Sequence, residues 1–216
     1  TPTLPRLAAA LPKMVSDIHE SRGLTAAVSE MHRLASLERL WMSPDTFRKV
    51  RETVDRYQAS AAGGWSGLVD LLDAVNHLIL DLAAISGLIQ DGMIRGPAWR
   101  VMDLGRRIER IQDTSRFLRS VMWGRQKVER PVLRAVLEVM DCRMTYRARY
   151  LDNVQQNAVL DLCITDETCP RSIAFQLVGL AEHVDALPGH EHALLRTEEK
   201  RIVMAATHVV RMISAE

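Results

Sequence analysis

The stretch Leu68–Leu88, LVDLLDAVNHLILDLAAISGL, decides the fold class of this chain. Its apolar residues recur at intervals of three and four, which is the period of an α-helix. Because they form a broad stripe, we expect this helix to be central and covered on several sides. The stripe consists of Leu68, Leu71, Leu72, Val75, Leu78, Ile79, Leu82, Ile85 and Leu88.

The same spacing recurs along most of the chain, and no stretch alternates with a period of two for long enough to predict a strand. We therefore predict an all-α protein, a multi-helix bundle of about eight or nine helices that forms a single domain over residues 1–216. Ser43 before Pro44 is a good helix start, and Thr168 or Cys169 is expected to cap a helix that has Pro170 in its first turn. The predicted helices cover approximately residues 4–21, 25–41, 44–58, 68–88, 97–123, 129–150, 154–164, 170–187 and 191–213.

Composition and charge argue against several classes of protein. The 216 residues are 47% hydrophobic, enough for a packed core, and 28 basic residues balance 27 acidic ones to a net charge of +1. No overall field attracts nucleic acid or an anionic membrane, and no apolar run reaches the ~20 residues that cross a bilayer. We therefore expect neither nucleic acid nor a membrane as a partner. The three cysteines form no Cys-x-x-Cys pair, which fits a reducing, cytoplasmic location.

Arginine gathers on one face of the helix expected at 97–123. Asp103, Arg106, Arg107 and Arg110 follow each other at i, i+3, i+4 and i+7, so they share one stripe. One interpretation is a solvated face with weak pairs such as Asp103 with Arg107. The other is a buried network between helices, because arginine is favoured where a planar fork holds a carboxylate or phosphate.

A second segment repeats this spacing with Arg143, Tyr146, Arg147 and Tyr150. These side chains predict either a pocket wall that binds an anionic group, or buried phenol rings beside arginines that meet nearby acids.

Asp166 and Glu167 precede a predicted helix, where the helix dipole alone stabilises negative charge. They are also placed to pair with the arginines of the two earlier segments, which would join three helices at one polar junction. We prefer this structural role to catalysis.

Metal and cofactor motifs are missing from the sequence. None of the seven histidines follows a glutamate by three, and there is no His-Glu-x-x-His. The glycine-rich phosphate-binding patterns and the Gly-x-Ser-x-Gly elbow are also absent. We therefore predict no metal site and no cofactor in this chain.

Three ordered motifs resemble the bacterial alpha-E domain family, an all-helical group. They are Met93-x-Arg95-Gly96-x-x-Trp99-Arg100-x-x-Asp103-Leu104-Gly105-Arg106-Arg107-Ile108-Glu109-Arg110, then Asp141-x-x-Met144-Thr145-Tyr146-Arg147-x-Arg149-Tyr150, then Asp166-Glu167-x-x-Pro170-Arg171-Ser172-x-Ala174-Phe175-Gln176-Leu177. The resemblance covers residues 25–216. The helix that usually opens the family's domain is not found, and the first residue is not methionine, so we expect a C-terminal portion of such a domain from a longer chain.

The resemblance implies partners rather than a reaction. Alpha-E domains look like companions, in trans or fused, of circularly permuted ATP-grasp amidoligases and transglutaminase-like proteins, in systems that make or modify peptides. ATP and magnesium would belong to the ATP-grasp partner.

Our main hypothesis is a non-catalytic accessory module that binds such a partner or its peptide. The alternatives are an enzyme with a polar Arg/Asp/Glu active site acting on a peptide or amide, and a structural scaffold that forms homo-oligomers.

The candidate residues for a ligand site or polar junction come from the three motifs. They are Arg95, Trp99, Arg100, Asp103, Arg106, Arg107, Glu109, Arg110, Asp141, Thr145, Tyr146, Arg147, Arg149, Tyr150, Asp166, Glu167, Arg171 and Ser172.

Overall fold

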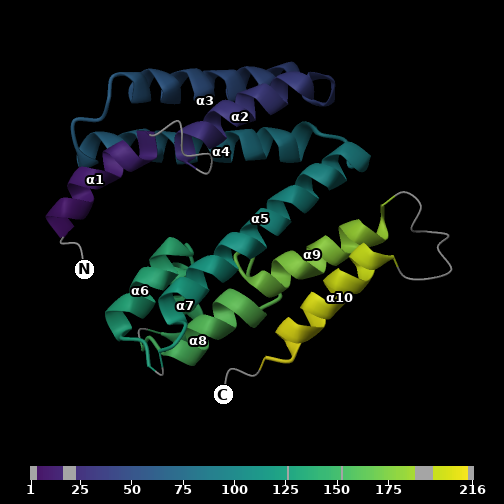
Figure 1. Ribbon diagram of the computed structural model, residues 1–216. Helices are drawn as coiled ribbons and strands as arrows, with labels where there is room; N and C mark the ends of the chain where they lie inside the picture. The colour runs from purple at the N-terminus through teal and green to yellow at the C-terminus, as the bar shows by residue number, and fades with distance from the viewer. Residues whose placement is uncertain (1–3, 17–22, 126, 152, 188–196, 214–216) are drawn as a thin grey trace. The chain divides into compact units, whose positions relative to one another are not determined.

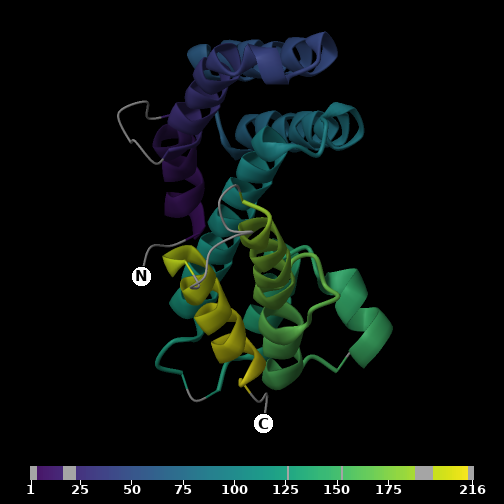
Figure 2. The ribbon, with the colours of Figure 1, turned by 90° about the vertical axis from the view of Figure 1, so that its right-hand side faces the viewer.

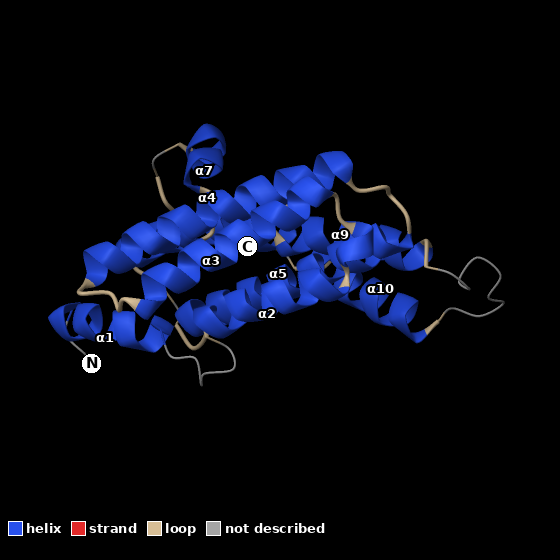
Figure 3. Cartoon of the chain, turned by 90° about the horizontal axis from the view of Figure 1, so that it is seen from above, coloured by secondary structure: helices blue, strands red, loops and turns tan. Residues whose placement is uncertain are grey.

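The computed structural model describes residues 4–16, 23–125, 127–151, 153–187 and 197–213, and within these ranges it contains helices and loops but no strand (Figure 3). The all-α prediction is confirmed. Ten α-helices are present in the described ranges, close to the number expected. The chain divides into two compact units, residues 1–94 and 95–216. The single domain stays a prediction.

The first unit is built on three helices that follow one another in sequence. Helix α2 packs against α3, and α3 packs against α4 (Figure 1). The core between them contains Val54, Tyr57 and Leu78, each at most 5% exposed. The elements are α1 (Leu4–Ser16), α2 (Leu24–Leu37), the short 3-10 helix η1 (Arg39–Trp41), α3 (Pro44–Ala62) and α4 (Leu68–Gly92). The predicted end of α1 at residue 21 lies outside the described residues.

Helix α3 starts where the sequence predicts. The Ser43 side chain accepts a hydrogen bond from the Thr46 backbone nitrogen at 3.1 Å, and Pro44 occupies the first turn, where no backbone N–H is needed.

Helix α4 buries only part of its apolar stripe. Leu71, Leu78 and Ile85 are buried, whereas Leu72 and Ile79 are more than half exposed. The face with Leu71, Leu78 and Ile85 packs on α3, whereas the face with Leu72 and Ile79 does not. The expectation that α4 is covered on several sides is therefore wrong for the face with Leu72 and Ile79.

The second unit has two cores, and one of them lies between neighbouring helices at the C-terminal end. Helix α9 packs against both α5 and α10, and Figure 2 shows α9 beside α10. Leu177 and Leu180 of α9 meet Val203 and Val210 of α10 there. The other core gathers residues from α6, α7 and the π-helix η2. The elements are α5 (Pro97–Met122), α6 (Arg130–Val139), α7 (Arg143–Tyr150), α8 (Gln156–Leu160), η2 (Asp161–Thr165), α9 (Ile173–Asp185) and α10 (Glu198–Arg211).

The single helix predicted at 129–150 is two helices, α6 and α7. Asp141 has a φ of 52°, in the left-handed region that ends a helix, and the Cys142 backbone nitrogen bonds to Leu137 O at 2.9 Å. The turn rotates the following residues, and Met144 is 75% exposed.

The predicted cap of the helix at 170–187 is also wrong. Helix α9 begins three residues later than Pro170, and Ser172 is the cap, since its side chain accepts from the Phe175 nitrogen at 3.0 Å. Cys169 is buried instead, and Thr168 donates to Asp166.

Among the described helices, none combines the length and the apolarity that a membrane span requires.

Candidate functional site

Asp103 is the centre of a buried polar network between α5 and α9. Its Oδ2 accepts hydrogen bonds from Arg107 Nε at 2.7 Å and His183 Nε2 at 2.8 Å. Burial raises the pKa of Asp103, but the hydrogen bonds from Arg107 and His183 outweigh burial, and the net effect is a pKa below the ordinary value. Arg107 also reaches Gln176 Oε1 at 3.4 Å. This network links the helices from the inside and leaves Asp103 little exposed to solvent.

Trp99 closes one end of the buried network. Its ring meets the His183 ring edge-on, with 5.1 Å between centroids, and the Arg95 guanidinium lies 4.4 Å from its centroid. Its Nε1 is buried and finds no hydrogen-bond acceptor among the described residues. His183 was not a candidate from the sequence, because a single histidine in an apolar helix carries no pattern. The only indication in the sequence was that Asp103, if buried, needs more than one hydrogen-bond donor.

Arg106 and Arg110, on the same helix, line a pocket of about 620 Å³, which we call the arginine pocket. Its wall is formed by α5, by the C-terminal end of α6 and by the loop before α9. The lining residues are Gly105, Arg106, Glu109, Arg110, Asp113, Thr114, Phe117, Val139, Met140 and Arg171. The pocket brings together four of the residues predicted from separate motifs: Arg106, Glu109, Arg110 and Arg171.

Arg110 has an unusual electrostatic environment in the arginine pocket. It is half-buried, and within the described part of the chain it has no hydrogen-bond or ion-pair partner. Burial lowers the pKa of Arg110, and the nearby guanidinium groups of Arg171, Arg106 and Arg107 lower it further. A cation held among cations is stabilised when an anion binds beside it.

The second predicted segment divides between core and surface. Tyr146 is 1% exposed, and its hydroxyl donates to Asn153 O and accepts from the Gln155 nitrogen, both at 3.0 Å. Arg147 lines a smaller pocket of about 250 Å³ together with Arg134 and Arg143. The interpretation as a buried phenol describes Tyr146, and the binding of an anionic group beside Arg147 stays a prediction.

Tyr150 donates to Asp161 Oδ2 at 2.8 Å, and burial, assisted by that carboxylate, raises the pKa of Tyr150 to about 12. It therefore stays a neutral phenol at physiological pH.

The remaining candidate acids and bases form separate pairs. Arg149 pairs with Asp166 and donates to Thr168 Oγ1, Arg171 lies 2.8 Å from Asp141, and Glu167 accepts from Arg211 at 2.6 Å. The single polar junction expected from the sequence is thus divided into groups on different elements. Thr145 and Arg100 are half-buried on α7 and α5, and Ser172 is the cap of α9.

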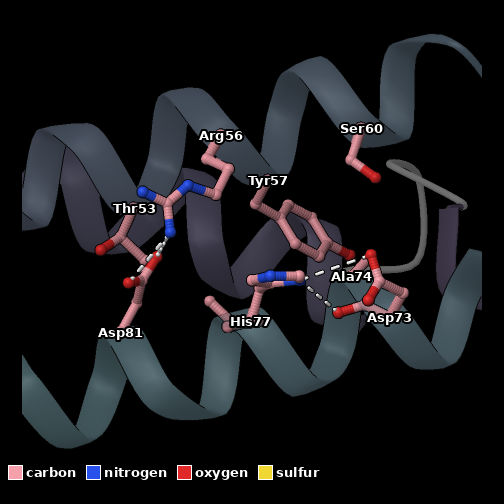
Figure 4. Close-up of a pocket in the computed structure, with 9 residues that line it drawn as sticks. Thr53, Arg56, Tyr57, Ser60, Asp73, Ala74, His77 and Asp81 are labelled. Carbon is pink, nitrogen blue, oxygen red and sulfur yellow. Dashed lines mark hydrogen bonds and ion pairs between the residues drawn. The ribbon is translucent and has the colours of Figure 1, made fainter.

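The first unit contains a groove between α3 and α4 that the sequence did not suggest, here called the α3–α4 groove (Figure 4). Its volume is about 370 Å³. Arg56 and Tyr57 enter it from α3, and Asp73, His77 and Asp81 enter it from α4, as Figure 4 shows. The charged residues are scattered over two helices without a recognisable motif, so only the packing of α3 on α4 brings them together.

Asp81 is the buried carboxylate of the α3–α4 groove. Its side chain is 8% exposed and accepts from Lys49 Nζ at 2.6 Å and from Arg56 Nη1 at 2.9 Å. Farther along α4, His77 Nδ1 lies 2.9 Å from the Asp73 carbonyl oxygen and 3.4 Å from the Asp73 carboxylate. Within the described ranges, no group of three or more His, Cys, Asp and Glu residues is arranged to hold a metal ion.

A family model matches residues 2–216. It is the Alpha-E model, described as "a predicted alpha-helical domain with a conserved ER motif". The match begins well before residue 25, so the extent expected from the sequence was too short. This chain contains three Glu-Arg dipeptides, at 38–39, 109–110 and 129–130, and the second lies in the arginine pocket.

Uncharacterized proteins of Mycobacterium bovis and Mycobacterium tuberculosis are 27% identical to this chain over 121 residues. The matched segment is 55% of this chain and 14% of each relative, so the chain spans only a small part of their length. No solved structure matches.

Proposed function

The chain belongs to the Alpha-E family, and on this premise we propose that it is a non-catalytic binding module whose arginine pocket holds a carboxylate of a partner protein or peptide. The observation that carries the proposal is Arg110, a half-buried cation without an anionic partner among the described residues. A bound anion would remove the repulsion that Arg110 experiences from Arg106 and Arg171.

The charge of the arginine pocket favours a carboxylate over a phosphate. Three arginines and two acids line it, which leaves an excess of one positive charge. A monoanion neutralises that excess, whereas a phosphate dianion would exceed it. Arginine also matches the planar carboxylate with two parallel hydrogen bonds.

The rest of the arginine pocket supports a peptide as the carrier of the carboxylate. Phe117, Val139 and Met140 provide apolar wall beside the arginines. Pockets of about 300–1,000 Å³ suit small ligands, and the 620 Å³ found here leaves room for a side chain next to the charged group.

A binding role agrees better with these side chains than an enzymatic one. The enzyme alternative would use Asp141 or Glu167 as acid or base, and each of these carboxylates is in an ion pair with an arginine. Arginine itself does not exchange protons near neutral pH.

The wider system is part of the proposal and rests on the family resemblance. An ATP-grasp amidoligase or a transglutaminase-like protein, fused or in trans, would be the partner. Its peptide substrate or product would supply the carboxylate, and any ATP and magnesium would be bound by that partner rather than by this chain.

The test uses a defined carboxylate probe. N-acetylated tripeptides ending in phenylalanine are compared with the corresponding C-terminal amides by calorimetry or NMR titration. We expect the acid to bind and the amide to bind at least tenfold more weakly, because a hydrogen-bonded charge pair contributes about 1.5–3 kcal/mol.

Arg110→Ala should remove binding of the acid with little change in the melting temperature. Arg119→Ala, an exposed arginine of the same helix outside the pocket, is the matched control. Equal binding of acid and amide, or full binding by Arg110→Ala, would disprove the assignment of the pocket.

A further inference from the structure

The α3–α4 groove has opposite net charges at its two ends. At one end, Lys49 and Arg56 together place two positive charges on the single carboxylate of Asp81. This end is therefore positive by one charge. At the other end lies Asp73, whose side chain is 73% exposed.

The positive end retains donors for a ligand. Arg56 uses Nη1 for both of its hydrogen bonds to Asp81, and its side chain is 53% exposed. The guanidinium has five N–H donors, so those on Nε and Nη2 can still bind a carboxylate.

The negative end has acceptors for a ligand. The Asp73 carbonyl oxygen can only accept, so His77 Nδ1 donates the hydrogen bond between them. The exposed Asp73 carboxylate has two acceptor oxygens, which suit an ammonium with its three donors.

We propose that the α3–α4 groove binds a short peptide with free ends, with its terminal carboxylate at Arg56 and its terminal ammonium at Asp73. This site lies in the first unit and is independent of the arginine pocket, so either proposal can hold without the other.

The distance between the ends sets the length of the peptide. Asp73 and Asp81 are eight residues apart in α4, and at 1.5 Å per residue they are separated by about 12 Å along the helix. An extended peptide advances about 3.5 Å per residue, so about three residues fill that distance. The 370 Å³ of the groove is near the lower limit of small-ligand pockets, which also favours a short chain.

The middle of the α3–α4 groove favours small apolar side chains. Leu78, Tyr57 and Ala74 line it, and Leu78 and Tyr57 are each at most 5% exposed. The Tyr57 hydroxyl is already within hydrogen-bond distance of Thr25 Oγ1, at 3.1 Å. The wall between the two charged ends therefore offers apolar contact to a ligand.

The experiment is an NMR or calorimetric titration of the full chain with trialanine. Trialanine with free ends is compared with its N-acetyl and C-amide forms, and with alanine and hexaalanine. We expect trialanine to bind best and each blocked form to bind about tenfold more weakly, because each block removes one charge-assisted contact. Equal binding of all forms would overturn the proposal.

A double-mutant cycle then places the ammonium. In Asp73→Asn, trialanine should bind as weakly as N-acetyl-trialanine binds the unmodified chain, and acetylation should have no further effect. Asp55→Asn, an exposed acid of α3 that does not line the groove, is the control and should bind as the unmodified chain does. Full trialanine binding by Asp73→Asn would overturn the proposal. This variant leaves the Asp81 ion pairs in place, so it tests the groove without disturbing them.

The two proposed sites respond to different variants. Arg110→Ala should leave trialanine binding unchanged, and Asp73→Asn should leave binding of the acetylated acid to the arginine pocket unchanged. If trialanine binding is lost in Arg110→Ala and retained in Asp73→Asn, the peptide occupies the arginine pocket, and the assignment to the α3–α4 groove is wrong.

Discussion

Replacing Asp103 with alanine removes the shared acceptor of Arg107 and His183 from the contact between α5 and α9. Removing one partner of a buried ion pair costs about 3–5 kcal/mol, because the other charge stays buried without compensation. The Arg107 side chain is still 20% exposed, so water compensates part of its charge. We therefore expect the free energy of unfolding to fall by about 2–4 kcal/mol.

The assay is urea denaturation, in which the midpoint should fall while the dependence on urea concentration stays constant. Asp113→Ala is the control, because that acid is on the same helix but its side chain is 70% exposed. It should change the free energy of unfolding by no more than about 0.5 kcal/mol. A loss below about 1 kcal/mol for Asp103→Ala would refute the view that this network holds α5 on α9.

Further predictions concern the same contact. Acid should weaken this contact, because the pKa of Asp103 is lower in the folded chain than its ordinary value of 3.8. The contribution of Asp103 to stability is complete above that value and is lost as pH falls through the lower folded pKa. Unfolding of wild type and Asp103→Asn, compared in the range below pH 4, should reveal this loss. Gly179→Ala should destabilise the folded chain by about 1–2 kcal/mol in thermal melts, despite the better helix propensity of alanine, because a Cβ at this position overlaps the Arg107 guanidinium. This cost should be smaller when Asp103 is also replaced. Ser172→Ala should cost about 1 kcal/mol through loss of the α9 cap, and Thr168→Ala, at the position first expected to be the cap, should leave the start of α9 intact by hydrogen exchange.

The helical fold was accessible from the sequence because its signal is local. Apolar spacing predicted a helix over the residues of each described α-helix, although it joined α6 and α7 into one, and Ser43 and Pro44 identified the start of α3. The break at Asp141 was not accessible, since the apolar spacing continues across it and only a left-handed backbone interrupts the helix.

The candidate site was only partly accessible because it depends on contacts between distant segments. The arginine spacing on α5 selected Arg106 and Arg110, which line the arginine pocket, but it grouped them with Asp103 and Arg107, which form the buried network with α9. In the α3–α4 groove, Arg56 and Asp81 are 25 residues apart, so neither residue indicates the other until α3 packs on α4.

The buried indole N–H of Trp99 makes the interior of the second unit observable. Its N–H is shielded from water and has no acceptor among the described residues, so its proton should exchange slowly with solvent and resonate apart from those of the exposed Trp41 and Trp123. Any loosening of α5 from α9 would admit water to that proton. A single indole resonance can thus report on the breathing motions of the helix that carries the arginine pocket, in every variant and with every ligand described above.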